Sequence, residues 1–412
     1  MPNINFMISL RTQCYRRQPR MSCRNNYLLQ TIFVGVFVLV SLYLLYKGES
    51  VQHDDFLLVN HEDNDPPKAN NYPVVNLKCL NDSAAITDTG LVHRKRNNYN
   101  HRIYLAVVCC GDRSEETLVM LKSAVLNTQR KLHFHIFAEE ELKPGLAKSL
   151  KSWPTDFQAK IEFTLHSIQF PNNENPEEWK SLFRTCATQR LFIPDVLTDV
   201  DSLLYVDTDT LFIRPPESLW SFFNEFNATH LAALAPEDEI AEVGWYDRFA
   251  RHPYYGLAGL NSGVLLMNLT RMRSFGWTEK IVPLYHEYKQ KIPWGDQDLL
   301  NILFYYHPDR VFIFPCEWNF RPNHCIWFKS CFRTNIQGVS IIHGSHKVFH
   351  SDKNWPFRIV YEAFLKYKLG LTPETHLVQN LQRKLSKLKS SDLFCGKTLL
   401  QPVITTLNSV QR

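Results

Sequence analysis

Apolar residues fall into short runs separated by amphipathic stretches from residue 101 onward. The segment 115–128 has the spacing of an amphipathic helix, and the longest later helical pattern spans about 179–191. The apolar runs are typical of buried strands and cover residues 103–110, 133–138, 161–168 and 203–207. Strands that alternate with helices in this way predict an α/β fold with a Rossmann-like, mixed but mostly parallel sheet flanked by helices.

A longer apolar segment lies at residues 27–46 and contains no charged residue. At about 1.5 Å per residue, a helix of this length spans the roughly 30 Å hydrocarbon core of a bilayer. Five arginines precede the segment within residues 1–26, so the positive-inside rule places that end in the cytoplasm. The segment ends in LLYKGES and lacks the small residues of a signal-peptide cleavage site, which favours an uncleaved anchor. We therefore expect a single-pass type II protein of the ER or Golgi membrane.

The rest of the chain divides by composition. Residues 47–100 are polar and lack sustained periodicity, which is typical of a luminal stem. The α/β domain is expected over residues 101–375. Residues 376–412 contain the basic stretch 383–391 and are expected to form a C-terminal tail with a peripheral helix.

The charge distribution and the missing motifs exclude several classes of protein. The formal net charge of +5 equals the five arginines of residues 1–26, so the remaining chain is electrically neutral, which disfavours a nucleic-acid binder. No G-x-G-x-x-G follows the first strand, and neither G-x-x-x-x-G-K-[ST] nor H-E-x-x-H occurs. A dinucleotide enzyme, a P-loop ATPase and a zinc protease therefore lose their main sequence support.

Cysteines and glycosylation triplets fit a luminal body. Eight of the ten cysteines follow the apolar segment, and disulfides are expected for several of them with the pairing left open. Cys316, Cys325 and Cys331 lie near His324 but lack C-x-x-C spacing, so disulfides are favoured over a zinc site. The candidate glycosylation sites are Asn81, Asn227 and Asn268.

The main candidate for chemistry is the D-T-D sequence at Asp207 and Asp209, where the apolar run 203–207 ends. Ligands of open α/β sheets bind outside the carboxyl ends of the strands. Two carboxylates in such a turn can reach one hard cation, which can in turn hold a diphosphate. Aspartate is also common in turns, but the position after a buried strand in a luminal protein favours a metal site. His343 ends a later apolar run and offers a third ligand, with a histidine beside a turn as the alternative.

Several motifs in order across residues 103–350 resemble the retaining glycosyltransferases of family eight, whose fold is GT-A. The shared motifs are DTD (207–209), NSGV (261–264), WGDQDLLN (294–301) and His343-Gly344. Longer segments, at 244–256, 261–273 and 314–325, are similar to the glucoside xylosyltransferases. This resemblance implies transfer of xylose from UDP-xylose, through an α-1,3 linkage, to glucose O-linked to EGF-like repeats such as those of Notch. It also implies Mn²⁺ as the cofactor.

The resemblance also implies roles for individual residues. Asp207, Asp209 and His343 match the manganese ligands, and Asp296 and Gln297 match the pair at the reacting centre. The residues that match the donor site, in addition to Asp207, are Val108, Cys109, Cys110, Gly111, Asp112, Arg190, Asn261, Ser262 and Gly263. Two structural alternatives accompany these roles, a simple turn for the NSG segment and a helix N-terminus for the GDQD segment.

The chain departs from the family pattern at the expected diphosphate lysine. The family often has H-x-x-G-x-x-K, whereas Gly344 here follows His343 directly, and Lys347 and Lys353 are the nearby substitutes. Two other functions stay open at this point: a related transferase that uses UDP-glucose or UDP-galactose, and a catalytically silent luminal lectin or scaffold. The presence of both DTD carboxylates favours a catalyst over the silent protein.

Overall fold

A seven-stranded sheet forms the centre of the fold, in the order β3-β2-β1-β4-β7-β6-β8. The computed structural model describes residues 102–326, 331–352, 355–387 and 399–410. Four of the six strand pairings are parallel, and β7 runs antiparallel to both of its neighbours. The strands are β1 (Arg102–Cys109), β2 (Lys131–Ala138), β3 (Ile161–His166), β4 (Ser202–Val206), β6 (Ala232–Pro236), β7 (Leu260–Asn268) and β8 (Val311–Ile313). The predicted mixed, mostly parallel sheet is confirmed.

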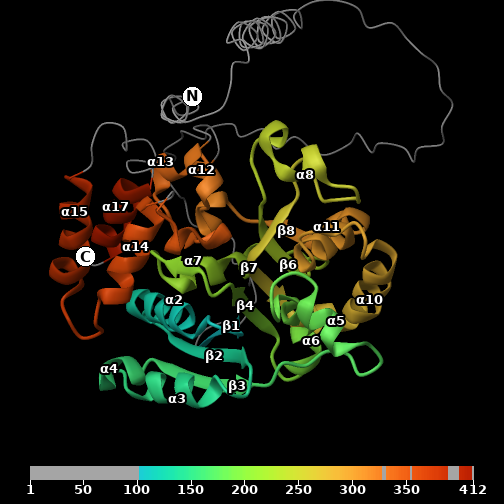
Figure 1. Cartoon of the computed structure of the whole chain (residues 1–412), viewed down its shortest axis with the longest axis horizontal. Coiled ribbons are helices and arrows are strands. Elements are labelled where there is room, and N and C mark those ends of the chain that lie inside the picture. Colours follow the sequence, from blue (N-terminus) through green and yellow to red (C-terminus); the bar gives the residue numbers. More distant parts are fainter. Residues whose placement is uncertain (1–101, 327–330, 353–354, 388–398, 411–412) are drawn as a thin grey trace, which may run out of the picture. The chain divides into compact units, whose positions relative to one another are not determined.

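Helices cover both faces of this sheet because successive strand residues point to opposite sides. Ala106 and Val108 of β1 pack into one apolar cluster, whereas Leu105 and Val107 pack into the other. The first cluster includes helices α6 (Ile193–Val196), α9 (Leu269–Phe275), α10 (Trp277–Tyr288) and α11 (Asp296–Tyr306). The second includes α2 (Ser114–Asn127), α3 (Lys143–Lys151) and α7 (Pro216–Trp220). In Figure 1, α10 and α11 lie to the right of the strands. Shorter helices are α4 (Thr155–Gln158), α12 (Pro322–Ile326) and α13 (Thr334–Gln337).

The single helix predicted over about 179–191 is wrong. Helix α5 (Pro176–Ser181) ends early, and a separate 3-10 helix covers Ala187–Phe192. Between them Cys186 has a φ of 62°, a left-handed conformation that interrupts a right-handed helix. A disulfide joins Cys186 to Cys110, just beyond the end of β1. This covalent link holds the 3-10 helix, and with it Arg190, beside the carboxyl end of the sheet.

A small second sheet brings two distant candidate segments together. Strands β5 (Thr210–Phe212) and β9 (Ile341–His343) pair antiparallel, with Thr210 opposite His343. The backbone N–H of Gly344 also donates to the carbonyl of Asp209 at 2.6 Å. The register therefore places His343 directly beside the DTD turn.

The C-terminal helices pack against this second sheet. Helices α14 (Trp355–Lys366), α15 (Gln379–Leu385) and α17 (Gln401–Val410) lie together at the left of Figure 1. Leu377, Val403 and Leu407 are fully buried in one cluster with residues of β5 and β9. The segment 376–412, expected as a tail with a peripheral helix, therefore packs through an apolar face in its described part, because its helices carry apolar residues at helical spacing.

The predicted anchor 27–46, the stem 47–100 and Asn81 lie outside the described residues. Among the residues that are described, no helix combines the length and apolar character needed to span a bilayer.

Candidate active site

A cavity of about 300 Å³ opens where β1 and β4 end and β7 begins. Residues from all three strands line it, as expected for a site at the carboxyl edge of an α/β sheet. The sequence-predicted residues that line the cavity are Val108, Cys110, Gly111, Asp112, Arg190, Asp207, Asp209, Asn261, Ser262, Gly263, Asp296, Gln297, His343 and Lys347. Cys109 does not line it: its thiol is buried on the opposite face of β1, because neighbouring strand residues alternate in direction.

Asp207, Asp209 and His343 form a group that can hold a metal ion. One ligand atom from each lies within 4.8 Å of the others, and His343 Nε2 is 3.7 Å from Asp207 Oδ2 and 3.4 Å from Asp209 Oδ1. The other ring nitrogen, Nδ1, is 2.9 Å from the side-chain oxygen of Asn319, which therefore accepts its proton. A neutral ring held in this way turns the lone pair of Nε2 toward the two carboxylates. Three acceptors then face one point, which fits a divalent cation.

Asn319 connects the metal group to the sugar side of the cavity. Its side-chain nitrogen donates to Asn261 Oδ1 at 2.7 Å, and the same oxygen accepts from the backbone N–H of Gly263 at 3.0 Å. Asn319 is fully buried. Sequence reasoning assigned it no role, although it lies in the segment 314–325 that resembles the xylosyltransferases. It is a positioning residue, because it acts through His343 and Asn261.

Gly263 allows the His343 ring to occupy its position. A Cβ at Gly263 would lie 2.2 Å from His343 Cε1 and 2.6 Å from Nδ1. Real carbon contacts are about 3.5 Å or longer, so any side chain here displaces the ring. The glycine of the NSG segment is therefore required by close packing against a metal-ligand candidate.

Arg190 is buried and bonded to two carboxylates. Its Nη2 is 2.8 Å from Asp207 Oδ1 and its Nε is 2.9 Å from Asp296 Oδ2. Nη1 donates to the carbonyl of Ser262 at 2.6 Å, and the guanidinium lies over the ring of Tyr205 at 4.7 Å. The resemblance placed Arg190 in the donor site. In the structure it fixes the relative positions of the DTD turn and α11.

The predicted reacting pair, Asp296 and Gln297, lies at the N-terminus of α11, which confirms the helix-terminus interpretation, and both side chains also line the cavity. Gly295 precedes the helix with a φ of 56°, and a Cβ there would lie 2.7 Å from Phe183. Burial raises the pKa of Asp296 to about 6, although Arg190 opposes the shift. Gln297 Oε1 accepts from Asn261 Nδ2 and from the backbone N–H of Ser262, both at 3.1 Å.

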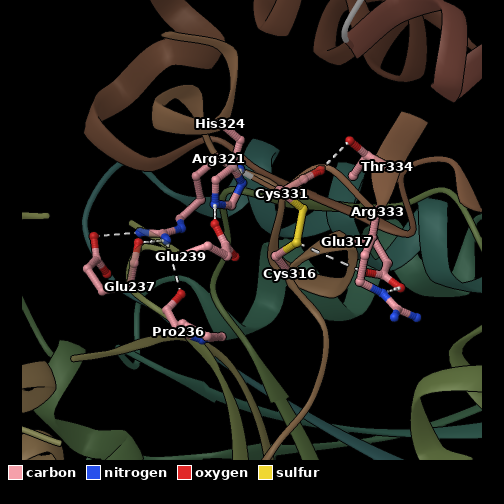
Figure 2. The surroundings of a disulfide bond; sticks show 10 residues. All are labelled: Pro236, Glu237, Glu239, Cys316, Glu317, Arg321, His324, Cys331, Arg333 and Thr334. Carbon is pink, nitrogen blue, oxygen red and sulfur yellow. Dashed lines mark hydrogen bonds and ion pairs between the residues drawn. A yellow bond between two sulfur atoms is a disulfide. The ribbon is translucent and has the colours of Figure 1, made fainter. Parts of the chain in front are cut away.

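A third carboxylate, Glu237, lies beside this pair and was missed by sequence reasoning. Its Oε2 accepts from Asn261 Nδ2 at 2.7 Å and from Gln297 Nε2 at 3.2 Å. Figure 2 shows Arg321 reaching the same carboxylate, with Nη1 2.5 Å from Glu237 Oε1. Both residues line the cavity. No local motif marks Glu237, because its partners come from β7, α11 and the segment after β8.

The loop that supplies Asn319 and Arg321 is closed by a disulfide. Cys316 and Cys331 are joined, as Figure 2 shows, so this disulfide takes two of the three sulfurs of the zinc alternative. Cys325 is also disulfide-bonded. Backbone hydrogen bonds from Phe320 N–H to the carbonyl of Ile341 and from His343 N–H to the carbonyl of Phe320 hold the part that precedes Arg321 beside β9.

Two glycosylation candidates differ in accessibility. Asn227 is exposed, at a turn before β6. Asn268 is buried, and its Oδ1 accepts from the backbone N–H of Arg271 as the N-cap of α9. The structure therefore argues against the glycan expected at Asn268, because the buried side chain leaves no space for a sugar on its nitrogen.

Comparison with known proteins identifies the family. The sequence profile of "Glycosyl transferase family 8" matches residues 91–347, more than half of the chain. The chain belongs to glycosyl transferase family 8. Glucoside xylosyltransferase 2 of Mus musculus is 51% identical over 306 residues, covering 72% of this chain and 68% of the relative. Glucoside xylosyltransferase 1 of Homo sapiens is 47% identical, covering 72% and 69%.

The fold comparison agrees with this assignment. A solved structure of an active-site mutant of LgtC matches with a TM-score of 0.50 at 19% identity, covering 66% of this chain and 98% of LgtC. That likeness bears on the fold alone. The expected resemblance to the glucoside xylosyltransferases is confirmed, and the chain is an enzyme of this xylosyltransferase group.

Proposed function

We propose that this enzyme transfers xylose from UDP-xylose, with retention and through an α-1,3 linkage, to glucose O-linked to EGF-like repeats such as those of Notch. The observation that carries the proposal is the cavity that unites Asp207, Asp209 and His343 with Asp296 and Gln297. The relatives support the sugar and the acceptor class, since each is a glucoside xylosyltransferase by name.

The proposed cofactor is Mn²⁺, held by Asp207, Asp209 and His343. When bound, the ion supplies positive charge that stabilises the UDP leaving group. Asn319 keeps the imidazole in the tautomer that offers Nε2, and Gly263 leaves room for the ring. These contacts prepare the ligand set before the donor arrives.

The remaining residues act on the donor sugar and the acceptor. Arg190 holds Asp296 at the end of α11, and Asn261 holds the side-chain oxygen of Gln297. Asp296 and Gln297 are placed to stabilise positive charge as it develops on the sugar. The acceptor hydroxyl attacks from the face that the leaving phosphate occupies, and a phosphate oxygen takes its proton. No covalent nucleophile is assigned.

Lys347 is proposed to contact the diphosphate. It lines the cavity three residues after Gly344, in a backbone conformation with a φ of 60°. That position lets a lysine reach the same cavity without the family's usual spacing. A charged ammonium near phosphate oxygens strengthens their binding.

We further propose that the enzyme is a single-pass type II protein of the ER or Golgi membrane with a luminal catalytic domain. The support is the uncharged segment 27–46 after five arginines, together with the disulfides Cys110–Cys186 and Cys316–Cys331. Disulfides persist in an oxidising compartment, which agrees with a luminal domain. Protease protection of the full chain in sealed microsomes tests this orientation: digestion of the catalytic domain without detergent would contradict it.

The test of the activity uses the full chain in detergent with Mn²⁺, an aryl glucoside and a series of UDP-sugars. The expected result is transfer of xylose that EDTA abolishes and Mn²⁺ restores. Transfer from UDP-glucose or UDP-galactose in place of UDP-xylose would contradict the proposed donor. A folded enzyme that neither transfers nor hydrolyses any donor would contradict the catalytic proposal.

A further inference from the structure

An exposed apolar segment lies beside the active site. Helix α8 (Trp245–Phe249) and the loop that follows it to residue 257 form this segment, which we call the rim segment. Phe249 is 53% exposed and Leu257 is 76% exposed. Large apolar side chains exposed together on a soluble surface often mark a site of protein contact.

The buried side of the rim segment is fixed to the reacting centre. The hydroxyl of Tyr246 donates to Asp298 at 2.8 Å and accepts from Asn301 at 3.0 Å and from Gln297 at 3.3 Å. A Cβ at Gly259 would lie 2.3 Å from the Tyr246 ring. The ring can therefore occupy its position only because residue 259 has no side chain. These contacts tie α8 to the start of α11, where the sugar is transferred. The exposed residues of α8 are therefore held at a set distance from the chemistry.

The exposed side of the rim segment continues into the cavity through aromatic contacts. The ring centroids of Phe249 and Trp245 are 6.3 Å apart, and those of Trp245 and Trp294 are 5.5 Å apart. Trp294 lines the cavity, and its ring centroid is 5.5 Å from that of Phe183, another lining residue. A series of ring contacts thus leads from Phe249 to the cavity.

The chemistry of this surface fits a polypeptide better than a sugar. A sugar needs hydrogen-bonding partners for its hydroxyl groups, and the side chains of Phe249 and Leu257 offer none. Protein partners bury such apolar side chains at the centre of an interface and meet charged residues at its edge. Arg248 and Arg251, both exposed, provide such an edge.

We infer that the rim segment docks the polypeptide that carries the acceptor sugar. The inference rests on the proposed function, in which the acceptor glucose is attached to a folded protein repeat. A glucose in the cavity leaves its attached protein outside the opening, within one sugar unit of the reacting centre. The rim segment lies at this place and presents the apolar side chains that a protein surface can cover.

The test compares two acceptors that differ only in the polypeptide: an O-glucosylated EGF-like repeat and an aryl glucoside. Phe249→Ala and Leu257→Ala are each expected to lower kcat/KM for the repeat about tenfold or more, as for the central residues of an interface. Both variants are expected to leave kcat/KM for the aryl glucoside within about twofold, because no reacting group is touched. The matched controls are Tyr305→Ala and Leu371→Ala, which remove exposed apolar side chains that do not line the cavity.

Each outcome decides the inference. An equal loss for both acceptors, or no loss for either, would overturn it. Equal losses from the rim variants and the controls would also overturn it, since the effect would then be general. Variants that change the oligomeric state while both rates stay at wild type would assign the surface to contact between copies. Wild-type enzyme that xylosylates neither acceptor would refute the proposed function, and the docking role with it.

Discussion

Gly263→Ala tests whether the space beside His343 is essential for metal binding. The added Cβ would lie 2.2 Å from Cε1 of the imidazole, whereas an ordinary carbon contact is about 3.5 Å. The ring must therefore move by about 1.3 Å or the β7 backbone must shift by the same amount. The hydrogen bond from Nδ1 to Asn319 limits the movement from the other side.

The size of the effect follows from this displacement. Moving a metal ligand or its support typically weakens metal affinity by about 10–100-fold. Misplacement by about 1 Å near the reacting atoms can lower the rate by about a hundredfold. We therefore expect the Mn²⁺ concentration for half-maximal activity to rise by at least about tenfold, and kcat at saturating Mn²⁺ to fall as well. Crowding of a packed site costs about 1–3 kcal/mol in the free energy of unfolding, so the variant should remain folded.

The assay is a Mn²⁺ titration of initial rates, together with direct Mn²⁺ binding to the protein without donor. Gly145→Ala is the matched control, because a Cβ at Gly145 meets no atom within 4 Å. The control should match the wild type in both measurements. Wild-type Mn²⁺ affinity and activity in a folded Gly263→Ala variant would contradict the close contact between residue 263 and the His343 ring, since the ring would then have room that the structure does not show.

Three further predictions follow from other contacts. Arg190→Lys should lower kcat/KM by about tenfold or more, because an ammonium lacks the fork that holds both Asp207 and Asp296; unchanged kinetics would contradict this role. Replacing both Cys316 and Cys331 with serine removes a disulfide that spans 15 residues, and it should lower the free energy of unfolding, measured in urea, by about 3 kcal/mol. A clearly smaller decrease would contradict this role of the disulfide. Burial, with neighbouring histidines, lowers the pKa of His135 to about 3, below the unfolded value of about 6.5. As the pH falls, the unfolded chain therefore binds a proton at His135 before the folded protein does, which lowers the free energy of unfolding. Between pH 7 and pH 5 the wild type should lose about 2 kcal/mol more of this free energy than His135→Asn. Equal losses in the two proteins would contradict the lowered pKa of His135.

The parts of the fold that local patterns encode were predicted well from the sequence. Strands β1, β2 and β4 and helix α2 appear where apolar periodicity placed them, because each buries a face that its own residues define. The DTD turn follows β4 for the same reason. Side chains alternate between the two faces along β1, so the sequence could also have predicted that Cys109 points away from the cavity while Val108 and Cys110 face it.

The parts that the sequence did not predict depend on contacts between distant segments. The helix over 179–191 is interrupted at the left-handed Cys186, and no local pattern encodes its disulfide to Cys110. Glu237 and Asn319 acquire their roles only when the segments before and after β7 meet at one cavity. Arg190 was placed at the site by resemblance, but its two carboxylate partners became visible only in the structure.

The most direct test of the proposed function is mass spectrometry of an O-glucosylated EGF-like repeat after incubation with the full chain. The reaction contains Mn²⁺ and equal concentrations of UDP-xylose, UDP-glucose and UDP-galactose, with an Asp209→Asn enzyme run in parallel. We expect the wild type to add a single pentose to the glucose and the variant, which loses a proposed metal ligand, to add essentially none. Addition of a hexose, or full pentose transfer by the variant, would contradict this expectation.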